Sequence, residues 1–307
     1  MIYSITLNPS LDHYMTCDSF EVGKTNRAVK ERLLVGGKGI NISMMLNQIG
    51  IRNRSIGFVA GFTGEEILKR LEEAGIEHDF IRTDSGFSRI NVKLMNGDLT
   101  EINGIGPMIG TNEINALFDK IDHVTENDAV IVSGNIPASI DIETYESLLG
   151  RINERKARLV VDTSGEKLKK SLEQKPFLIK PNLVELEELF QCKISSLEEA
   201  ACCALKAQSA GALNVIVSLG PQGAILLDEN KCCFHAKSPE IAVRNSVGAG
   251  DVLLASFLGE YIGTNVYPEA FTYAVSAATL HARDDTYPTD EEIREYEKQL
   301  QIKEMTL

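Results

Sequence analysis

The feature that most restricts the fold of this chain is an alternation of short apolar runs with segments of helical periodicity, from residue 37 onward. The apolar runs are rich in β-branched residues and occupy residues 128–133, 157–162, 176–180 and 214–218. Helical periodicity occupies residues 142–154 and 196–209. Apolar strands that alternate with amphipathic helices are typical of a parallel β-sheet covered on both faces. We therefore expect an α/β fold.

Two stretches, residues 12–36 and 88–102, depart from this alternation and carry alternating polar and apolar residues. The second contains Asn96-Gly97, and Asn-Gly between alternating runs is the strongest short hairpin signal. We expect a small antiparallel sheet that projects from an α/β body formed by residues 1–11, 37–87 and 103–307. A small sheet with an apolar face needs a partner, so it is a candidate lid, dimer interface or both. A plain edge hairpin on the main sheet is the alternative.

Small and polar residues follow all four apolar runs. They are Ser133-Gly134-Asn135, Asp162-Thr163-Ser164, Lys180-Pro181-Asn182 and Ser218-Leu219-Gly220. In open α/β sheets, ligands bind in the crevice beyond the carboxyl ends of the strands. One such group alone is typical of an ordinary strand-to-helix turn, but four in succession favour a binding site at this edge.

The most specific local motif is Gly248-Ala249-Gly250-Asp251, which begins an apolar stretch that reaches Ile262. Glycines at the start of a helix let backbone N–H groups converge on an anion. A carboxylate beside such a cradle matches the base of a phosphoryl-transfer enzyme, where it accepts the proton of the attacking hydroxyl. Taken alone, Asp251 is equally well explained as a cap or as a partner of the helix dipole.

The charge of the chain limits its partners. It has 31 basic and 44 acidic residues, a formal charge of −13, which argues against nucleic-acid binding through the overall field. Residues 24–38 reverse this balance, because they contain one acid, Glu31, and several cations that suit a phosphate ligand or a solvated basic face. The cations are Lys24, Arg27, Lys30, Arg32 and Lys38.

The sequence also bears on the compartment. No apolar run is long enough for a membrane helix, and the N-terminus lacks the pattern of an export signal. The six cysteines show no C-x-x-C spacing and are typical of reduced thiols. We expect a cytoplasmic protein that binds neither membranes nor nucleic acid.

Four motifs occur in one order along nearly the whole chain. They are Gly36-Gly37-Lys38-Gly39-Ile40-Asn41, Lys180-Pro181-Asn182 followed by Glu185, Ser218-Leu219-Gly220 followed by Gly223, and Gly248-Ala249-Gly250-Asp251. In this combination the chain resembles the PfkB-type, ribokinase-like carbohydrate kinases. The resemblance implies a three-layer α/β/α sandwich with a small antiparallel β-sheet lid, and ATP and Mg²⁺ as cofactors.

The resemblance also implies roles for individual residues. Asp251 is then the general base, and the amides of Gly248, Ala249 and Gly250 form an anion hole. The residues expected near ATP are Lys180, Asn182, Ser218, Gly220 and Gly223, with Asn182 and Glu185 holding Mg²⁺. The residues expected near the sugar are Asp12, Gly37, Asn41 and Asn135. The candidates for the phosphate of the substrate are Lys38 and Arg89, with Lys24, Arg27 and Asn103 on the lid side.

Within this family, Arg89-Ile90-Asn91-Val92-Lys93 and Glu101-Ile102-Asn103 resemble 1-phosphofructokinases and, less closely, tagatose-6-phosphate kinases. We expect phosphorylation of fructose 1-phosphate to fructose 1,6-bisphosphate, by a homodimer formed through the lid. The alternatives are phosphorylation of tagatose 6-phosphate to tagatose 1,6-bisphosphate and, in another class, a catalytically silent sugar-phosphate sensor. A dehydrogenase is disfavoured because no Gly-x-Gly-x-x-Gly pattern is present.

Three positions depart from the pattern of the family. The family usually has Asp where Asn245 stands, Ser where Asn135 stands, and a small Ala or Gly where Ser256 stands. None of these changes removes the expected base or its glycines. Because Asn135 is expected near the sugar, it is a candidate for altered substrate preference.

Overall fold

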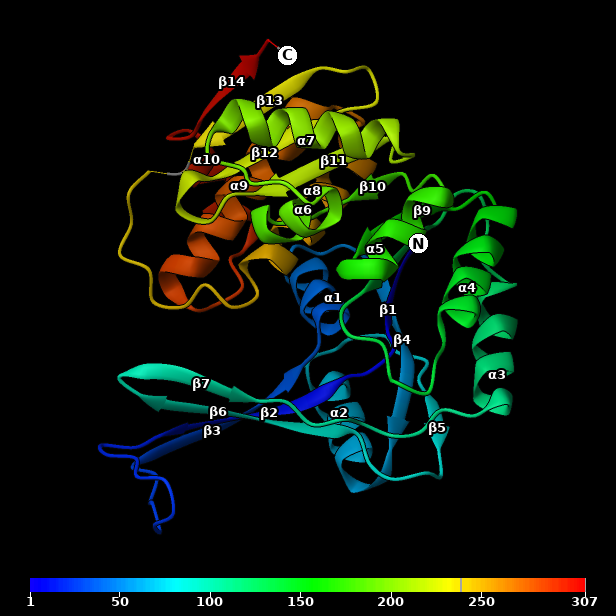
Figure 1. Cartoon of the computed structure of the whole chain (residues 1–307), viewed down its shortest axis with the longest axis vertical. Coiled ribbons are helices and arrows are strands. Elements are labelled where there is room, and N and C mark those ends of the chain that lie inside the picture. Colours follow the sequence, from blue (N-terminus) through cyan, green and yellow to red (C-terminus); the bar gives the residue numbers. More distant parts are fainter. Residues whose placement is uncertain (238, 307) are drawn as a thin grey trace.

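The computed structural model describes residues 1–237 and 239–306, and in them a ten-stranded sheet forms the middle layer of the body (Figure 1). Its strands are β1 (Ile2–Thr6), β4 (Asn53–Ala60), β5 (Ile81–Thr83), β8 (Ala129–Ser133), β9 (Arg158–Asp162), β10 (Leu178–Ile179), β11 (Asn214–Ser218), β12 (Ala224–Leu227), β13 (Cys233–Lys237) and β14 (Gln301–Met305). Their order is β14-β13-β12-β11-β10-β9-β8-β1-β4-β5. Strands from β11 to β5 pair in parallel, and β12 to β14 add by antiparallel pairing.

Helices cover both faces of this sheet. One face carries α3 (Thr111–Ile121), α4 (Ile142–Glu154), α5 (Gly165–Glu173), α6 (Leu183–Phe190) and α7 (Leu197–Ser209). The other carries α1 (Lys38–Gln48), α8 (Ala249–Thr264), α9 (Tyr267–Asp284) and α10 (Asp290–Glu297). Helix α2 (Gly61–Glu73) packs with α1 and β4 in a third, smaller core. The expected α/β/α layering is confirmed.

The strands of the body are apolar on both sides because both sides are covered. In β9, Leu159 and Val161 belong to the core with α3–α7, whereas Val160 belongs to the core with α8 and α9. Successive side chains of a strand point to opposite faces, so a strand between two helical layers has no position for a solvated residue. The continuous apolar runs of the sequence follow from this arrangement.

A smaller sheet, the lid, projects from the body (Figure 1). In the described residues it has four strands, β2 (Ser10–Thr16), β3 (Lys30–Gly36), β6 (Arg89–Asn96) and β7 (Asp98–Ile102), in the order β3-β2-β6-β7. The Asn96-Gly97 hairpin forms as expected, with Gly97 at φ +78°, a conformation that glycine adopts without strain. The lid is therefore a separate sheet rather than an edge hairpin of the main one.

The pairing within the lid corrects one detail of the expectation. The outer pairs β2–β3 and β6–β7 are antiparallel, but the central pair β2–β6 is parallel, so the sheet is mixed. The two hairpins leave the body in separate excursions of the chain, and their relative direction depends on where each leaves. Local alternation of residues contains no information about that direction.

Among the described residues, no helix is long and apolar enough to cross a membrane.

Candidate active site

The register of the parallel strands brings the expected polar residues to one edge of the sheet. Thr6 at the end of β1 pairs with Ser133 at the end of β8, and Ser133 pairs with Asp162 at the end of β9. Ile179 of β10 pairs with Val161, so Lys180 follows beside Asp162. The sequence-based prediction of a polar cluster beyond the carboxyl ends of these strands is consistent with this register.

Asp162 is the centre of a buried charge cluster. Its carboxylate is fully buried, with Oδ1 2.9 Å from Lys38 Nζ and Oδ2 3.4 Å from Lys180 Nζ. Burial alone raises the pKa of Asp162, but Lys180 and Lys38 outweigh it and hold that pKa below its usual range. Burial likewise lowers the pKa of Lys38, yet Asp162 and Asp251 outweigh burial and raise it. Lys38 is therefore held as a cation.

Asp162 was not among the residues to which we assigned a role from the sequence. It appeared only as the first of three polar residues after an apolar strand. The available signal is an acid at the end of a buried strand, together with Lys38 at the start of α1 and Lys180 directly after the end of β10. Recognising it required knowing that β9 and β10 are neighbours.

Helix α8 begins at the glycine motif. Gly248 is the residue before the helix and has φ +84°, a left-handed conformation that favours glycine. Its N–H has no hydrogen-bond partner in the described residues. Lys180 Nζ lies 3.1 Å from where a Cβ on Gly250 would be, so glycine there lets the ammonium approach the helix start. The unpaired Gly248 N–H, the start of helix α8 and the buried Lys180 ammonium together suit an anionic group.

Asp251 lies in the first turn of α8 and is 5% exposed. Its Oδ2 accepts a hydrogen bond of 2.7 Å from Asn41 Nδ2, on helix α1. Burial and the nearby charge of Asp162 raise the pKa of Asp251 to about 6, against the lowering effect of Lys38. A carboxylate with this pKa is ionised at neutral pH and is a better proton acceptor than an ordinary aspartate.

The turn after β11 contains the residues expected near a nucleotide. Gly220 has φ +60° and Gly223 has φ +86°. A Cβ on Gly223 would lie against the carbonyl oxygen of Ala236 and 3.0 Å from Lys237 Cα, so the turn packs directly on β13. Ser218 at the end of β11 forms a bridge with Asn182, which brings the two nucleotide motifs together.

Asn182 and Glu185 form a capping box at the start of α6. Asn182 Oδ1 accepts a bond of 2.9 Å from the Glu185 N–H, and Glu185 Oε2 accepts one of 2.9 Å from the Asn182 N–H. No group of three or more His, Cys, Asp or Glu within the described residues is arranged to hold a metal. Mg²⁺ commonly takes one or two carboxylates together with water and nucleotide phosphates. Glu185, whose Oε1 is not used by the cap, fits such a site.

Polar side chains of the lid lie where the lid meets the body. Asp12 Oδ1 accepts bonds from Ser10 Oγ at 2.6 Å and Asn91 Nδ2 at 2.8 Å. A Cβ on Gly36 would lie 2.5 Å from the Asp12 carboxyl carbon, so that carboxylate lies directly over the glycines that lead into α1. Arg89 is half-buried and donates from Nε to the carbonyl oxygen of Asn8 at 3.0 Å. Asp12 and Arg89 thus lie where the lid meets the body.

Four expected residues are exposed and are not linked to this cluster by any hydrogen bond. Lys24 and Arg27 belong to the loop between β2 and β3, at the end of the lid far from the body (Figure 1), and Lys24 pairs with Glu21. Asn103 directly follows β7, and Asn135 follows the end of β8. The contacts described above link Lys38 and Lys180 through Asp162, and Asn41 with Asp251, whereas these four residues lie outside those contacts.

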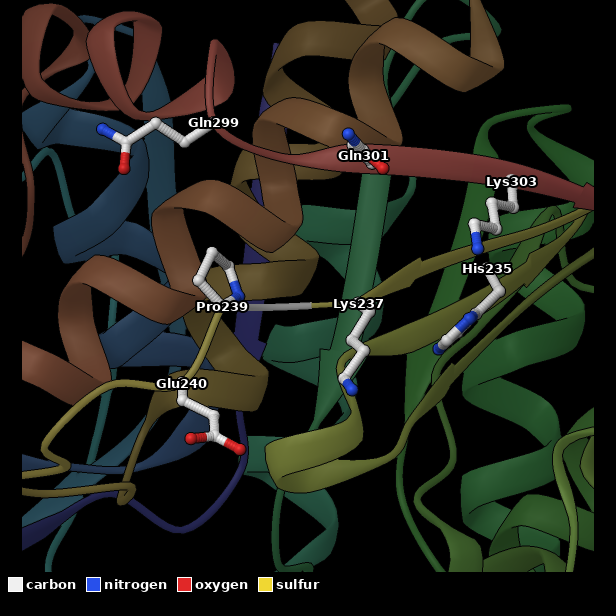
Figure 2. A pocket seen from close by; sticks show the side chains of 7 residues that line it. All are labelled: His235, Lys237, Pro239, Glu240, Gln299, Gln301 and Lys303. Atoms are coloured by element: carbon white, nitrogen blue, oxygen red, sulfur yellow. The ribbon is translucent and has the colours of Figure 1, made fainter.

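A separate hollow lies at the outer edge of the main sheet. Figure 2 shows its lining residues, with Gln301 and Lys303 on β14 and His235 and Lys237 on β13. His235 Nε2 lies 2.9 Å from the carbonyl oxygen of Gln222, so the hollow borders the nucleotide turn. None of the residues predicted for the site lines it.

Comparison with known proteins decides the family. A model described as pfkB family carbohydrate kinase matches residues 5–286. The chain belongs to this family. It is a carbohydrate kinase, a phosphotransferase, and kinases of this family use ATP. The resemblance inferred from the four motifs is confirmed.

Individual relatives agree with this assignment. The kinase is 40% identical to 1-phosphofructokinase of Bacillus subtilis (strain 168) over 295 residues, covering 96% of this chain and 97% of that protein. It is 34% identical to D-tagatose-1-phosphate kinase of Bacillus licheniformis over 284 residues, 92% of each chain. The structure of phosphofructokinase-2 from Escherichia coli in complex with fructose-6-phosphate matches with a TM-score of 0.90 at 23% identity, covering 97% and 98% of the two chains. At that identity the likeness shows the fold, which is the expected ribokinase-like one.

Proposed function

We propose that this kinase transfers the γ-phosphoryl group of ATP to the 6-hydroxyl of fructose 1-phosphate and forms fructose 1,6-bisphosphate. The observation that carries the proposal is Asp251, a buried carboxylate with a raised pKa at the start of helix α8, beside the free N–H of Gly248. The 40% identity to a 1-phosphofructokinase over nearly the whole chain supports the substrate.

The proposed reaction needs a base and a positive environment. Asp251 accepts the proton of the attacking hydroxyl, and Asn41 holds the carboxylate in place through its 2.7 Å hydrogen bond. The amides of Gly248, Ala249 and Gly250 and the Lys180 ammonium stabilise the negative charge of the transferred phosphoryl group. These groups are fixed before the substrate binds, so little reorganisation is required.

ATP and Mg²⁺ bind beside this centre in the proposal. The nucleotide lies along Ser218, Gly220 and Gly223, with Lys180 and Asn182 near its phosphates. Glu185 and Asn182 hold Mg²⁺ through water, and the ion supplies charge neutralisation on the phosphate oxygens when bound. The capping box orients both side chains for this task.

The sugar phosphate lies between the lid and the body. Asp12, Gly37 and Asn41 bind its hydroxyls, and Lys38 and Arg89 bind its phosphate. Asn135 lies near the sugar, and Asn103 belongs to the lid side. Lys24 and Arg27, at the far end of the lid, reach a phosphate only if the lid of a second subunit contributes to the site.

A tagatose phosphate is the second candidate substrate. The observation that favours it is the 34% identity to a D-tagatose-1-phosphate kinase. Fructose and tagatose phosphates share a phosphate at one end and a primary hydroxyl at the other, so the same groups of this site serve either. A sensor without activity has no need of Asp251 in this environment.

The test is release of ADP with a panel of acceptors. Fructose 1-phosphate, tagatose 6-phosphate, tagatose 1-phosphate, fructose 6-phosphate and ribose are compared at matched concentrations by kcat/KM. We expect the highest value with fructose 1-phosphate. A higher value with a tagatose phosphate assigns the enzyme to that substrate, and no stimulation by any sugar supports the sensor.

We also propose a homodimer formed through the lid, in the cytoplasm. Exposed apolar side chains on the lid support the dimer; they are Val22, Val29, Leu34, Met95, Leu99 and Ile102. The six free cysteines support a reducing compartment. Sedimentation equilibrium of the wild type and of Leu99→Glu tests the dimer, because a charge in the interface shifts the equilibrium toward monomer.

A further inference from the structure

A buried histidine of helix α9 contacts the loop that leads into the anion site. His281 lies in the last turn of α9 and is 6% exposed. Its Nε2 lies 3.1 Å from the carbonyl oxygen of Val247, and its Nδ1 lies 2.8 Å from that of Thr286. A carbonyl oxygen only accepts, so in each contact the ring nitrogen is the donor when it carries a proton.

The bond to Val247 determines the direction of the next amide. The peptide bond between Val247 and Gly248 is trans, so its C=O and N–H point in opposite directions. Because His281 draws the Val247 oxygen toward α9, the Gly248 N–H points away from α9. That N–H is the one that has no partner within the described residues.

The part of the loop before Val247 is also hydrogen-bonded to the last turn of α9. The N–H groups of Arg244 and Asn245 bond to the carbonyl oxygen of Ala282 at 2.9 and 3.2 Å. A Cβ on Gly248 would lie 3.2 Å from His281 Nε2, so the ring packs closely against the glycine itself. The loop backbone is anchored upstream by α9, and His281 is the side chain that fixes its last peptide.

We propose that His281 is a positioning residue for the anion hole: its Nε2–H holds the Val247 carbonyl and thereby aims the Gly248 N–H at the transferred phosphoryl group. The inference rests on the proposed function, because it assigns a task within that site. His281 touches neither substrate, so its loss should affect the charge-stabilising step and leave substrate binding intact.

Three variants separate the two bonds of the ring. In His281→Gln the side-chain amide can donate from the position of Nε2, toward the Val247 carbonyl. In His281→Asn it can donate from the position of Nδ1, toward the Thr286 carbonyl. His281→Leu has no donor. We expect kcat to fall about 10- to 100-fold in the Leu and Asn variants, because misplacing one donor of an anion hole has effects of this order. We expect the Gln variant to retain kcat within about threefold, and KM for both substrates to change less than about twofold in all three.

A matched control comes from the same helix. Tyr273 of α9 is buried, and its hydroxyl donates to Asp290 Oδ1 at 2.8 Å, away from the loop. Tyr273→Phe removes a buried hydrogen bond of α9 and should lower the melting temperature without changing kcat. Equal losses of kcat in the Gln and Asn variants, rescue by Asn alone, or losses that follow melting temperature across all four variants would overturn the inference.

A second measurement is independent of turnover. Aluminium fluoride with MgADP occupies the place of the transferred phosphoryl group, and its binding is measured by calorimetry. We expect His281→Leu to weaken binding of the fluoride complex about tenfold, while ADP alone binds as in wild type. If wild type phosphorylates no sugar phosphate but His281→Leu still binds the fluoride complex more weakly than wild type, the proposed function fails and the inference stands. If wild type is active and the Leu variant binds the complex normally, the inference fails and the function stands.

Discussion

The body and the lid hold the charged groups of the proposed site by different means. In the body, β8 and β9 are buried on both faces, and Asp162 is fully buried between Lys38 and Lys180. In the lid, β7 is exposed along its whole length and most of β3 is exposed. The charges of the body are thus fixed by packing, whereas those of the lid are fixed mainly by hydrogen bonds within a thin sheet.

This difference suggests a division of tasks. Groups held in a low-dielectric core interact strongly with one another, so they determine pKa values and the stabilisation of charge. A sheet with little core of its own moves more easily than the body and is suited to closing over a substrate. We therefore expect changes in the body to affect kcat and its pH dependence, and changes in the lid to affect KM for the sugar phosphate.

The largest effect is expected from the body, at Asp251. Asp251→Asn removes the proton acceptor while it preserves shape, so kcat should fall about 10²- to 10⁴-fold with little change in KM. Steady-state kinetics with fructose 1-phosphate checks this. Near-normal kcat would show that another group accepts the proton.

Asp162→Asn tests whether the buried charges act together. Asp162 raises the pKa of Asp251, so removing its charge should lower that pKa and move the acid limb of kcat/KM from about pH 6 to lower pH. The acid limb moves to lower pH because the base must be deprotonated to act, and a lower pKa keeps it deprotonated in more acidic solution. An acid limb that stays in place, or moves upward, contradicts the coupling.

The same substitution should destabilise the fold. Lys38 and Lys180 would lose their shared carboxylate in a buried site, and removing one partner of a buried ion pair costs about 3–5 kcal/mol. Denaturant unfolding measures this loss. Glu166→Gln, a change of an exposed acid in the first turn of α5, is the control and should have little effect.

The comparison also explains how much the sequence predicts. The runs at 157–162 and 214–218 each have three consecutive apolar β-strand formers at their centre, and they form β9 and β11 within one residue of the expected bounds. The segment 142–154 forms α4 with the same bounds, and Asn96-Gly97 forms the lid hairpin. In each case the signal is local, because periodicity and turn chemistry act over a few residues.

What the sequence leaves out depends on contacts between distant segments. The role of Asp162 arises from its neighbours Lys38 and Lys180, which come from other parts of the chain. The parallel pairing of β2 with β6 and the contact of His281 with Val247 likewise join segments that no local pattern relates. The motifs therefore predict candidate residues for the site, but they do not predict the contacts that hold those residues in place.

In the lid, Asp12→Asn should raise KM for the sugar phosphate more than it lowers kcat. Asp12 is held by Ser10 and Asn91, and its carboxylate is proposed to accept from a sugar hydroxyl. Losing a hydrogen bond to a charged group corresponds to a rise of about 10-fold or more in KM. Glu31→Gln, in exposed strand β3, is the matched control and should leave KM unchanged. If kcat instead falls as steeply as in Asp251→Asn, the lid has a direct part in the chemistry.

The smallest effect is expected at the one ion pair that, among the described residues, joins a lid strand to the end of α9. Arg32 Nη1 lies 3.1 Å from Asp285 Oδ2, and Asp285 Oδ1 also accepts from Asn245 Nδ2 at 2.7 Å, in the loop before the anion site. Because Arg32 is 42% exposed, the pair contributes at most about 1 kcal/mol to stability and weakens with salt. Arg32→Gln should therefore change the free energy of unfolding little. It should raise KM for the sugar phosphate a few-fold at low salt, because a lid without this ion pair closes less readily.

The control is Arg52→Gln, which breaks an exposed ion pair with Glu77 inside the body. It should leave KM unaltered at any salt concentration. If both variants behave alike, closure of the lid does not depend on this contact, and the other contacts between lid and body, such as the packing of β2 and β3 on α1 and α2 and the bond from Arg89 to the Asn8 carbonyl, govern it instead.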